Sequence, residues 1–350
     1  MSEKINNILL EYIWIGGNRE LRSKVKVFRN INLIHKLRTN KDPWDSINDL
    51  PLWNYDGSST NQATTNDSEV ILRPVRLYRN PFSEDIAFLV LCDTWVHKDG
   101  ELISHETNTR IKAENKFKNE DNDIPLFGIE YEFFVKSKGI PLGYNGNMTS
   151  PQGKYYCSVG YGNSFGREIL ELTTKFCLIA GINVTGYNLE VAPGQMEIQV
   201  CEKGLKASDD CIILKYILSR IGEINSLEID WSSKPLSGDW NGSGCHVNFS
   251  TKEMREEGGW DHILKAIKKL KDNHMDHMKV YGDDNKLRLT GKHETSNYNE
   301  FSFGVASRSS SIRIPRETEK NKKGYFEDRR PSSSADMYQV TSKIYETCTK

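Results

Sequence analysis

Six ionisable residues interrupt stretches of this chain that are otherwise apolar or rich in glycine, and any fold must accommodate them. They are Glu130, Glu132, Glu190, Glu197, His246 and Glu327. Such stretches are typical of β-strands, where an ionised side chain costs free energy unless a cation or a partner neutralises it. The pattern therefore predicts a sheet with one polar face directed at a shared cation.

The spacing of these residues indicates which of them act together. Glu130 and Glu132 are two positions apart, so in a strand both side chains leave the same face. Adjacent carboxylates repel one another, and a metal ion between them removes the repulsion. Glu190 and Glu197 flank a Pro-Gly turn signal that would fold them towards each other. Because hard divalent cations prefer oxygen ligands and accompany nucleotides, we expect a metal-dependent phosphoryl-transfer site.

A second group of residues is cationic. Arg288 precedes a polar loop that contains Glu294, and further arginines follow at 308, 313, 316, 329 and 330. Guanidinium groups bind phosphate and carboxylate through paired hydrogen bonds. A strand over 311–316 is expected to hold some of these arginines on one side. A basic surface for RNA is the alternative, but the interleaved aromatic residues that would stack on bases are missing.

Composition narrows the class of protein. A formal net charge of -1 over 350 residues argues against bulk attraction to nucleic acid or to an anionic membrane. No stretch approaches the ~20 apolar residues that cross a bilayer, and the start lacks the apolar run of a secretory signal. The seven cysteines are scattered without a Cys-x-x-Cys pair. We therefore expect a cytoplasmic protein with neither nucleic acid nor membrane as its partner.

Hydrophobic periodicity predicts an α+β fold. The first part of the chain contains short strand-like segments, whereas the later part alternates helices with strands. The expected helices cover 167–180, 208–224 and 259–277, and the expected strands of the later part cover 127–136, 188–199, 246–250 and 301–305. Helices on one face of a mainly antiparallel sheet form such a domain. We predict an N-terminal domain at 1–100 and a second domain at 101–350.

In chain order, these segments resemble the glutamine synthetases of the eukaryotic type (class II). The resemblance is carried by Trp-Asn-Tyr-Asp-Gly-Ser-Ser-Thr at 53–60, Gly-Ile-Glu-Tyr-Glu at 128–132, Glu-Val-Ala-Pro-Gly-Gln-Met-Glu at 190–197, Asn-Gly-Ser-Gly-Cys-His-Val-Asn-Phe-Ser at 241–250, and further motifs at 289–302, 307–316 and 324–332. It implies a small N-terminal β-grasp domain and a larger catalytic domain whose curved sheet is backed by helices.

The resemblance also implies roles for single residues. One metal ion would be held by Glu132, Glu190 and Glu197, and a second by Glu130, His246 and Glu327. Glutamate would be bound by Asn241, Gly242, His246, Arg288, Arg308 and Arg329, and the nucleotide by Ser250, Arg308, Arg313 and Tyr325. Asp56 would bind ammonium and remove its proton, Glu294 would shield the intermediate, and Arg308 and Arg329 would take part in catalysis.

The activity that the resemblance implies is the ATP-dependent joining of ammonia to the γ-carboxylate of L-glutamate through γ-glutamyl phosphate. Two or three Mg²⁺ or Mn²⁺ ions would serve each site. The expected assembly is a decamer of two stacked pentameric rings, in which the Asp56 segment completes the site of a neighbouring subunit.

Three alternatives stay open at this point. The chain could join glutamate to a larger amine or a polyamine, or it could be a catalytically silent homologue that forms rings. A phosphagen kinase also combines a γ-phosphate with several arginines, but it would not need six metal-type residues.

Overall fold

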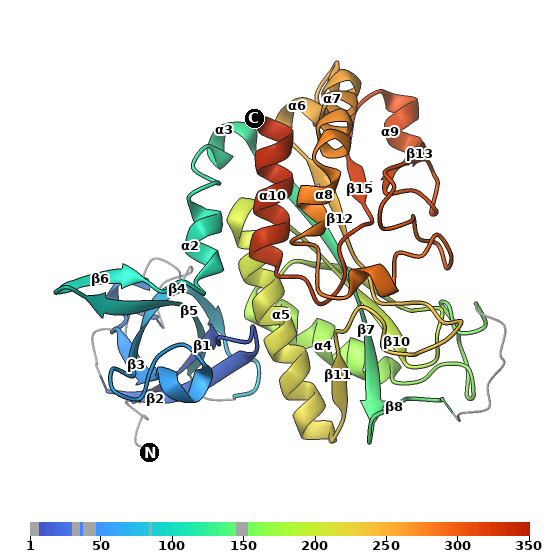
Figure 1. Ribbon diagram of the computed structural model, residues 1–350. Helices are drawn as coiled ribbons and strands as arrows, with labels where there is room; N and C mark the ends of the chain where they lie inside the picture. The colour runs from blue at the N-terminus through green and yellow to red at the C-terminus, as the bar shows by residue number, and fades with distance from the viewer. Residues whose placement is uncertain (1–6, 30–35, 38–46, 84–85, 145–152) are drawn as a thin grey trace. The chain divides into compact units, whose positions relative to one another are not determined.

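The computed structural model describes residues 7–29, 36–37, 47–83, 86–144 and 153–350. The chain forms two compact units. Residues 1–112 with 176–182 make the first unit, and residues 113–175 with 183–350 make the second. Each unit contains its own sheet (Figure 1).

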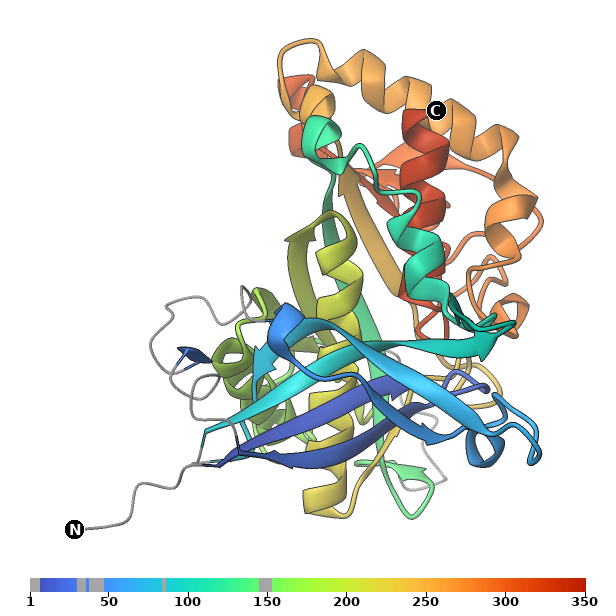
Figure 2. The same ribbon diagram turned by 90° about the vertical axis from the view of Figure 1, so that its left-hand side faces the viewer.

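The first unit contains a six-stranded sheet in the order β2-β1-β5-β4-β3, with β6 paired to β5. Its strands are β1 (Ile8–Ile15), β2 (Leu21–Phe28), β3 (Trp53–Asp56), β4 (Glu69–Arg79), β5 (Ala87–Lys98) and β6 (Glu101–Ser104). The pairing of β1 with β5 is parallel, and the other pairings are antiparallel. The blue and cyan strands of this sheet run side by side in Figure 2. Their inner face buries an apolar core that includes Leu10, Tyr12 and Val90.

The second unit is built on a nine-stranded sheet in the order β13-β14-β15-β12-β7-β10-β9, with β8 and β11 paired to β7. Its strands are β7 (Leu126–Ser137), β8 (Ile140–Pro141), β9 (Val184–Leu189), β10 (Gln195–Lys203), β11 (Glu228–Asp230), β12 (Cys245–Ser250), β13 (Phe303–Val305), β14 (Ile312–Ile314) and β15 (Phe326–Asp328). Only the pairing of β13 with β14 is parallel among these described strands.

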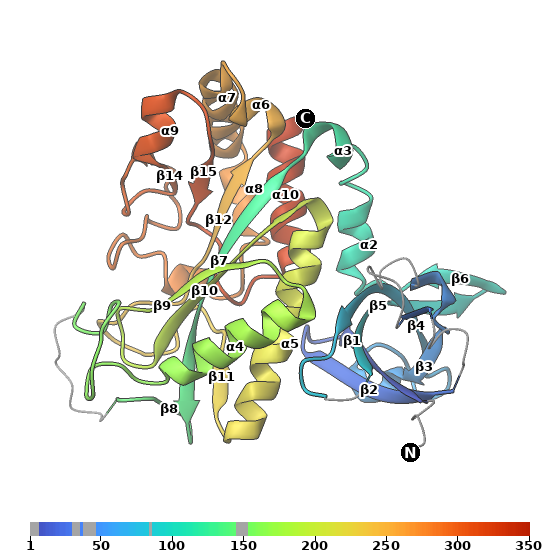
Figure 3. The ribbon, with the colours of Figure 1, turned by 180° about the vertical axis from the view of Figure 1, so that it is seen from behind.

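The described part of the chain contains the helices α2 (Thr109–Glu114), α3 (Glu120–Asp123), α4 (Arg167–Ala180), α5 (Gly204–Asn225), α6 (Lys252–Arg255), α7 (Gly259–Asp272), α8 (His274–Met278), α9 (Arg316–Asn321) and α10 (Met337–Thr349). The long helix α5 packs against β7 and β10, and α10 packs against α5 and α7 (Figure 3). No helix within the described ranges has the length and apolar character needed to span a membrane.

The predicted α+β fold class is confirmed, and the differences in its elements have local causes. The helix expected at 259–277 is two helices, which are separated at Asn273, where a φ of -109° and a ψ of 19° lie outside the helical region. The strand expected at 188–199 is a hairpin, since Gly194 has a φ of 71° between β9 and β10. The strand expected at 311–316 ends at Ile314, and Arg316 begins α9.

Candidate active site

The register of three neighbouring strands gathers four of the six ionisable residues. Glu197 on β10 lies opposite Glu132 on β7, and Glu130 on β7 lies opposite His246 on β12. Because side chains alternate along a strand, Ile129, Tyr131 and Phe133 point to the buried face of β7. The two carboxylates of β7 are therefore left on the opposite face, as their spacing predicts.

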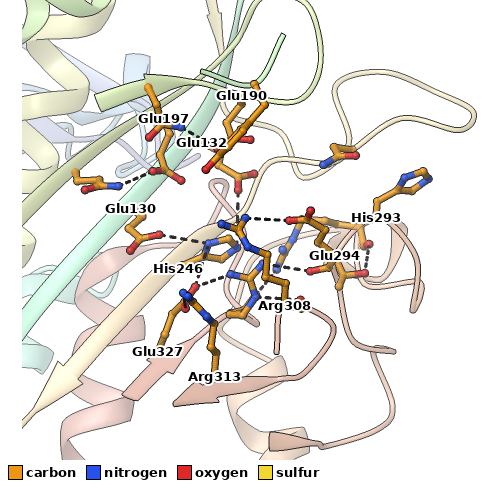
Figure 4. Close-up of a pocket in the computed structure, with 18 residues that line it drawn as sticks. Glu130, Glu132, Glu190, Glu197, His246, His293, Glu294, Arg308, Arg313 and Glu327 are labelled. Carbon is orange, nitrogen blue, oxygen red and sulfur yellow. Dashed lines mark hydrogen bonds and ion pairs between the residues drawn. The ribbon is translucent and has the colours of Figure 1, made fainter. Parts of the chain in front are cut away.

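These residues line one cavity of about 210 Å³ (Figure 4). Apart from Gly242, every lining residue has a polar side chain. The lining comprises Glu130, Glu132, Tyr156, Asn188, Glu190, Glu197, Gln199, Asn241, Gly242, His246, Arg288, His293, Glu294, Thr295, Arg308, Arg313, Glu327 and Arg329. A cavity of this composition suits small, highly charged ligands rather than an apolar one.

Two groups of side chains in this cavity have the donor set of a divalent metal site. The potential ligand atoms of Glu132, Glu190 and Glu197 lie within 4.8 Å of one another, and so do those of Glu130, Glu197 and His246. Carboxylate oxygens with one imidazole nitrogen are suitable ligands for Mg²⁺ or Mn²⁺. Glu197 belongs to both groups, so it is placed to bridge two ions.

The raised pKa values of the carboxylates in these two groups indicate that the site favours a cation. Burial, followed by the charges of Glu132 and Glu197, raises the pKa of Glu190 well above its usual value. Burial, followed by Glu130 and Glu132, raises the pKa of Glu197 to about 8. A divalent ion supplies the charge that such crowded carboxylates lack.

His246 is in the form that binds metal. Burial lowers its pKa to about 4, so the ring is neutral near pH 7. Its nitrogens lie 3.6 to 3.8 Å from oxygens of Glu130, Glu132 and Glu327, which is too far for hydrogen bonds. A neutral imidazole with a free lone pair is a common metal ligand.

Glu327 is held differently from the other carboxylates. Its Oε2 accepts from Arg313 Nη1 at 2.8 Å, and its Oε1 accepts from Arg329 Nη1 at 2.6 Å. Oε1 also lies 3.6 Å from His246 Nδ1. Two arginines thus neutralise this carboxylate, which lies at the junction between the acidic and the cationic parts of the cavity.

Side-chain amides support the carboxylates, and the sequence analysis missed them. Gln199 donates to Glu197 at 2.6 Å, Asn188 to Glu190 at 3.0 Å, and Asn248 to Glu130 at 2.8 Å. Each amide lies two positions along a strand from an expected metal residue: 197, 190 and 246. The period of two was a signal that could have found them, because it places both side chains on one face.

The cationic part of the cavity contains buried atoms that need a ligand. Asn241 Oδ1 and Arg313 Nε have no hydrogen-bond partner among the described residues, although both are buried. Arg288 Nη2 donates to the carbonyl oxygens of residues 329, 330 and 331, and its Nε donates to Asn285. Within the described chain, only Nη1 of this guanidinium donates no hydrogen bond, so it is the nitrogen left for a substrate.

Packing in the cationic part of the cavity requires glycine at position 242. A β-carbon at this position would clash with the carbonyl oxygen of Ser233 and with the side chain of Arg288. The carbonyl oxygen of Gly242 accepts from Gln195 Nε2 at 3.1 Å. Glycine therefore lets the backbone pack closely against Ser233 and Arg288 at this position.

The loop that contains Glu294 forms another wall. Arg308 Nη1 donates to Glu294 Oε2 at 3.1 Å, and Arg329 Nη2 donates to the carbonyl oxygen of Glu294 at 3.2 Å. Figure 4 shows the side chains of Glu294 and Arg308 directed at one another inside the cavity. His293, which the sequence analysis did not single out, also lines it.

Three predicted residues do not line the cavity. Ser250 ends β12, and its Oγ accepts from Arg255 Nη1 at 2.8 Å. Tyr325 precedes β15 and is 42% exposed. Asp56 belongs to the first unit, where it accepts from Ser58 N, Ser58 Oγ and Ser59 Oγ at 2.7 to 3.0 Å. The hydrogen bonds from Ser58 and Ser59 lower the pKa of Asp56 to about 2, so this exposed carboxylate stays ionised.

Comparison with known proteins gives one consistent match. Residues 108–258 match the family model described as glutamine synthetase, catalytic domain. The glutamine synthetase nodule isozyme of Medicago sativa is 47% identical over 354 residues, which cover 99% of this chain and 95% of the relative. The glutamine synthetase cytosolic isozyme 1-1 of Oryza sativa subsp. japonica has the same identity and coverage. A protein of Acanthamoeba polyphaga mimivirus is 48% identical over 351 residues, again 99% of this chain and 95% of the relative.

Proposed function

This chain belongs to the glutamine synthetase family, and from that relationship we propose that it is a glutamate–ammonia ligase, which forms glutamine, ADP and phosphate from L-glutamate, ammonia and ATP. The reaction would pass through γ-glutamyl phosphate. One observation carries the proposal: a cluster of carboxylates suited to cations faces a set of arginines suited to anions across a single cavity. A carboxylate substrate that is phosphorylated with the help of cations needs both groups: the carboxylates form the acidic half of the cavity, and the arginines form its cationic half.

The acidic half would hold two divalent ions, with Glu132, Glu190 and Glu197 around one of them. Glu130 and His246 would bind the other, and either Glu197 or Glu327 could complete that set. Bound ions would neutralise the phosphate oxygens and the transferred group. The surrounding amides orient the carboxylates before any ion binds, which limits reorganisation.

The cationic half would bind the anionic substrates. Arg313 and Arg308 are suited to phosphate oxygens, whereas Arg288 Nη1 and Asn241 Oδ1 are suited to the carboxylate and the ammonium group of glutamate. Arg329 bridges the two regions through Glu327 and the Glu294 loop. Catalysis by this arrangement consists mainly of positioning and charge stabilisation.

The ammonium site would come from Asp56. A carboxylate with a pKa of about 2 attracts ammonium, and three hydrogen bonds fix its orientation. We propose that it acts in the cavity of a neighbouring subunit within a ring-shaped decamer, as the family resemblance implies. The names of cytosolic relatives from Medicago sativa and Oryza sativa support a cytoplasmic location.

The purified full-length protein tests this proposal. Glutamate, ammonia, ATP and Mg²⁺ should give equal amounts of glutamine and phosphate. A panel of larger amines in the same assay separates the alternatives. Phosphate release with a larger amine but not with ammonia would indicate a different glutamyl-amine ligase, and release with no amine would indicate a silent homologue.

A further inference from the structure

We infer that Asp239 is a positioning residue, which anchors the tip of the Glu294 loop at the wall of the cavity. The inference rests on the proposed function, because Glu294 has a shielding task only if the site forms an acyl phosphate that water could hydrolyse. Asp239 itself does not line the cavity.

The base of the loop is closed by its own backbone. Thr290 bridges to Asn297, the amide of Tyr298 donates to Leu289 at 3.0 Å, and the amide of Gly291 donates to Ser296 at 3.3 Å. These bonds fix where the loop leaves and rejoins the fold. They do not fix the direction of its tip.

The tip itself is strained. His293 and Glu294 have φ angles of 53° and 60°, in the left-handed region that residues with a side chain rarely adopt. The amide of Thr295 donates to the carbonyl oxygen of Lys292 at 3.2 Å, so these two residues are the central pair of a tight turn. The turn sets the local shape of the tip, and contacts with other segments set where the tip points.

Arg308, Arg329 and Asp239 contact the tip from other segments of the described chain. Arg308 and Arg329 bind the side chain and the carbonyl oxygen of Glu294, respectively. In the contact with Asp239, His293 Nε2 lies 2.8 Å from Asp239 Oδ1. Both arginines are expected to bind anionic substrates, which would compete with Glu294 for them. The contact with Asp239 does not face that competition, and neither does the hydrogen bond from Thr295 Oγ1 to the carbonyl oxygen of Arg288 at 3.2 Å, so both remain when substrates bind.

Asp239 projects from a well-fixed turn. Gly238 has a φ of 85°, and the amide of Trp240 donates to the carbonyl oxygen of Gly238 at 3.0 Å. Trp240 packs with Phe134 and Ala192, and Lys234 donates to its carbonyl oxygen. The next two residues, 241 and 242, line the cavity. The contact between His293 and Asp239 thus joins the substrate-binding segment to the Glu294 loop.

Hydrogen exchange tests the anchoring without requiring activity. The side chain of Asp239 is 90% exposed, so Asp239→Ala removes little from the core. In Asp239→Ala the amides of Gly291 and Thr295 should exchange about two- to fivefold faster, the range expected for the loss of one hydrogen bond. Asp239→Asn keeps an acceptor oxygen for His293 and should exchange like the wild type. Glu257→Ala, which breaks the exposed contact with Lys323, is the matched control and should also leave the loop unchanged. Equal exchange in Asp239→Ala and wild type would overturn the inference.

Turnover tests the consequence for the reaction. Asp239→Ala should release more phosphate than it forms glutamine and should raise the KM for glutamate more than it lowers kcat, whereas Asp239→Asn should restore the wild-type ratio. A wild-type protein that forms no glutamine would refute the proposed function and leave the exchange result standing. A wild-type protein that forms glutamine, together with an unchanged product ratio in Asp239→Ala, would refute the positioning role alone.

Discussion

Glu197 lies directly opposite Glu132 in the antiparallel pairing of β10 with β7, and both side chains enter the same cavity. Burial and the neighbouring carboxylates raise the pKa of Glu197 to about 8, which means that the pair holds a proton near neutral pH unless a cation replaces it. Competition between a proton and a metal ion for this position underlies the first two predictions.

Glu132→Gln and Glu190→Gln should each lower the rate of glutamine formation by at least about 1000-fold, because a bound metal ion contributes several kcal/mol to the transition state. The side-chain oxygen of a glutamine at position 132 can still accept the hydrogen bond that the amide of Gly244 donates to Glu132 at 2.7 Å. The fold should therefore survive. Calorimetric titration with Mg²⁺ and the thermal midpoint of the metal-free variants are the measurements. A variant that binds Mg²⁺ with wild-type affinity or keeps near-normal turnover would contradict the metal assignment.

Metal affinity should rise with pH up to about 8 and then level off. Below the raised pKa of Glu197 a proton occupies the position that the cation needs, so binding at pH 7 should release protons. Titration calorimetry with Mn²⁺ in two buffers of different ionisation enthalpy measures this release. Glu197→Gln should lower the proton release and weaken binding, whereas Glu257→Gln should change neither.

Asp56→Ala should lower glutamine formation by about 100- to 10,000-fold, the usual contribution of a positioned base. The binding of ATP and glutamate to the second unit should be unaffected, since Asp56 belongs to the first unit. Ser59→Ala keeps the carboxylate and removes one of its hydrogen bonds, so it should cost far less activity. Equal losses in the two variants would show that the shape of the turn, and not the charge, is what matters.

Acid should destabilise the second unit through His277. Burial lowers the pKa of this residue from 6.5 to about 3, and its ring bonds Tyr281 at 2.6 Å and Thr347 at 2.9 Å. The unfolded chain takes up a proton below pH 6.5 that the folded chain refuses, so stability is lost as pH falls through this range. The loss by pH 5 is about 2 kcal/mol.

The measurement is the urea midpoint between pH 7.5 and 5. His277→Gln retains polar atoms without a titrating ring, and it should show a weaker decline over this range. An equal decline in the variant and the wild type would remove His277 as the cause.

Part of the site was readable from local patterns. Residues two apart on a strand share a face, which was enough to predict that Glu130 and Glu132 act together, and the fold lines the cavity with both. The same rule could have found the amides of Gln199 and Asn188. The hairpin at Pro193-Gly194 was signalled by its turn residues, although the strand boundaries around it were not.

Other relationships had no local signal. Glu327 is neutralised by Arg313, which is 14 positions away, and His293 meets Asp239 across 54 positions. The break between α7 and α8 lies in the backbone angles of Asn273, which periodicity does not register.

The sequence by itself determined the α+β fold class and the residue types of the site, because alternation along a strand and turn chemistry are properties of neighbouring residues. The tertiary structure alone decided that Glu197 is shared by two acidic groups, that two arginines hold Glu327, and that Asp239 reaches the Glu294 loop. These contacts follow from the register between strands and from loop packing, which join residues distant in the chain.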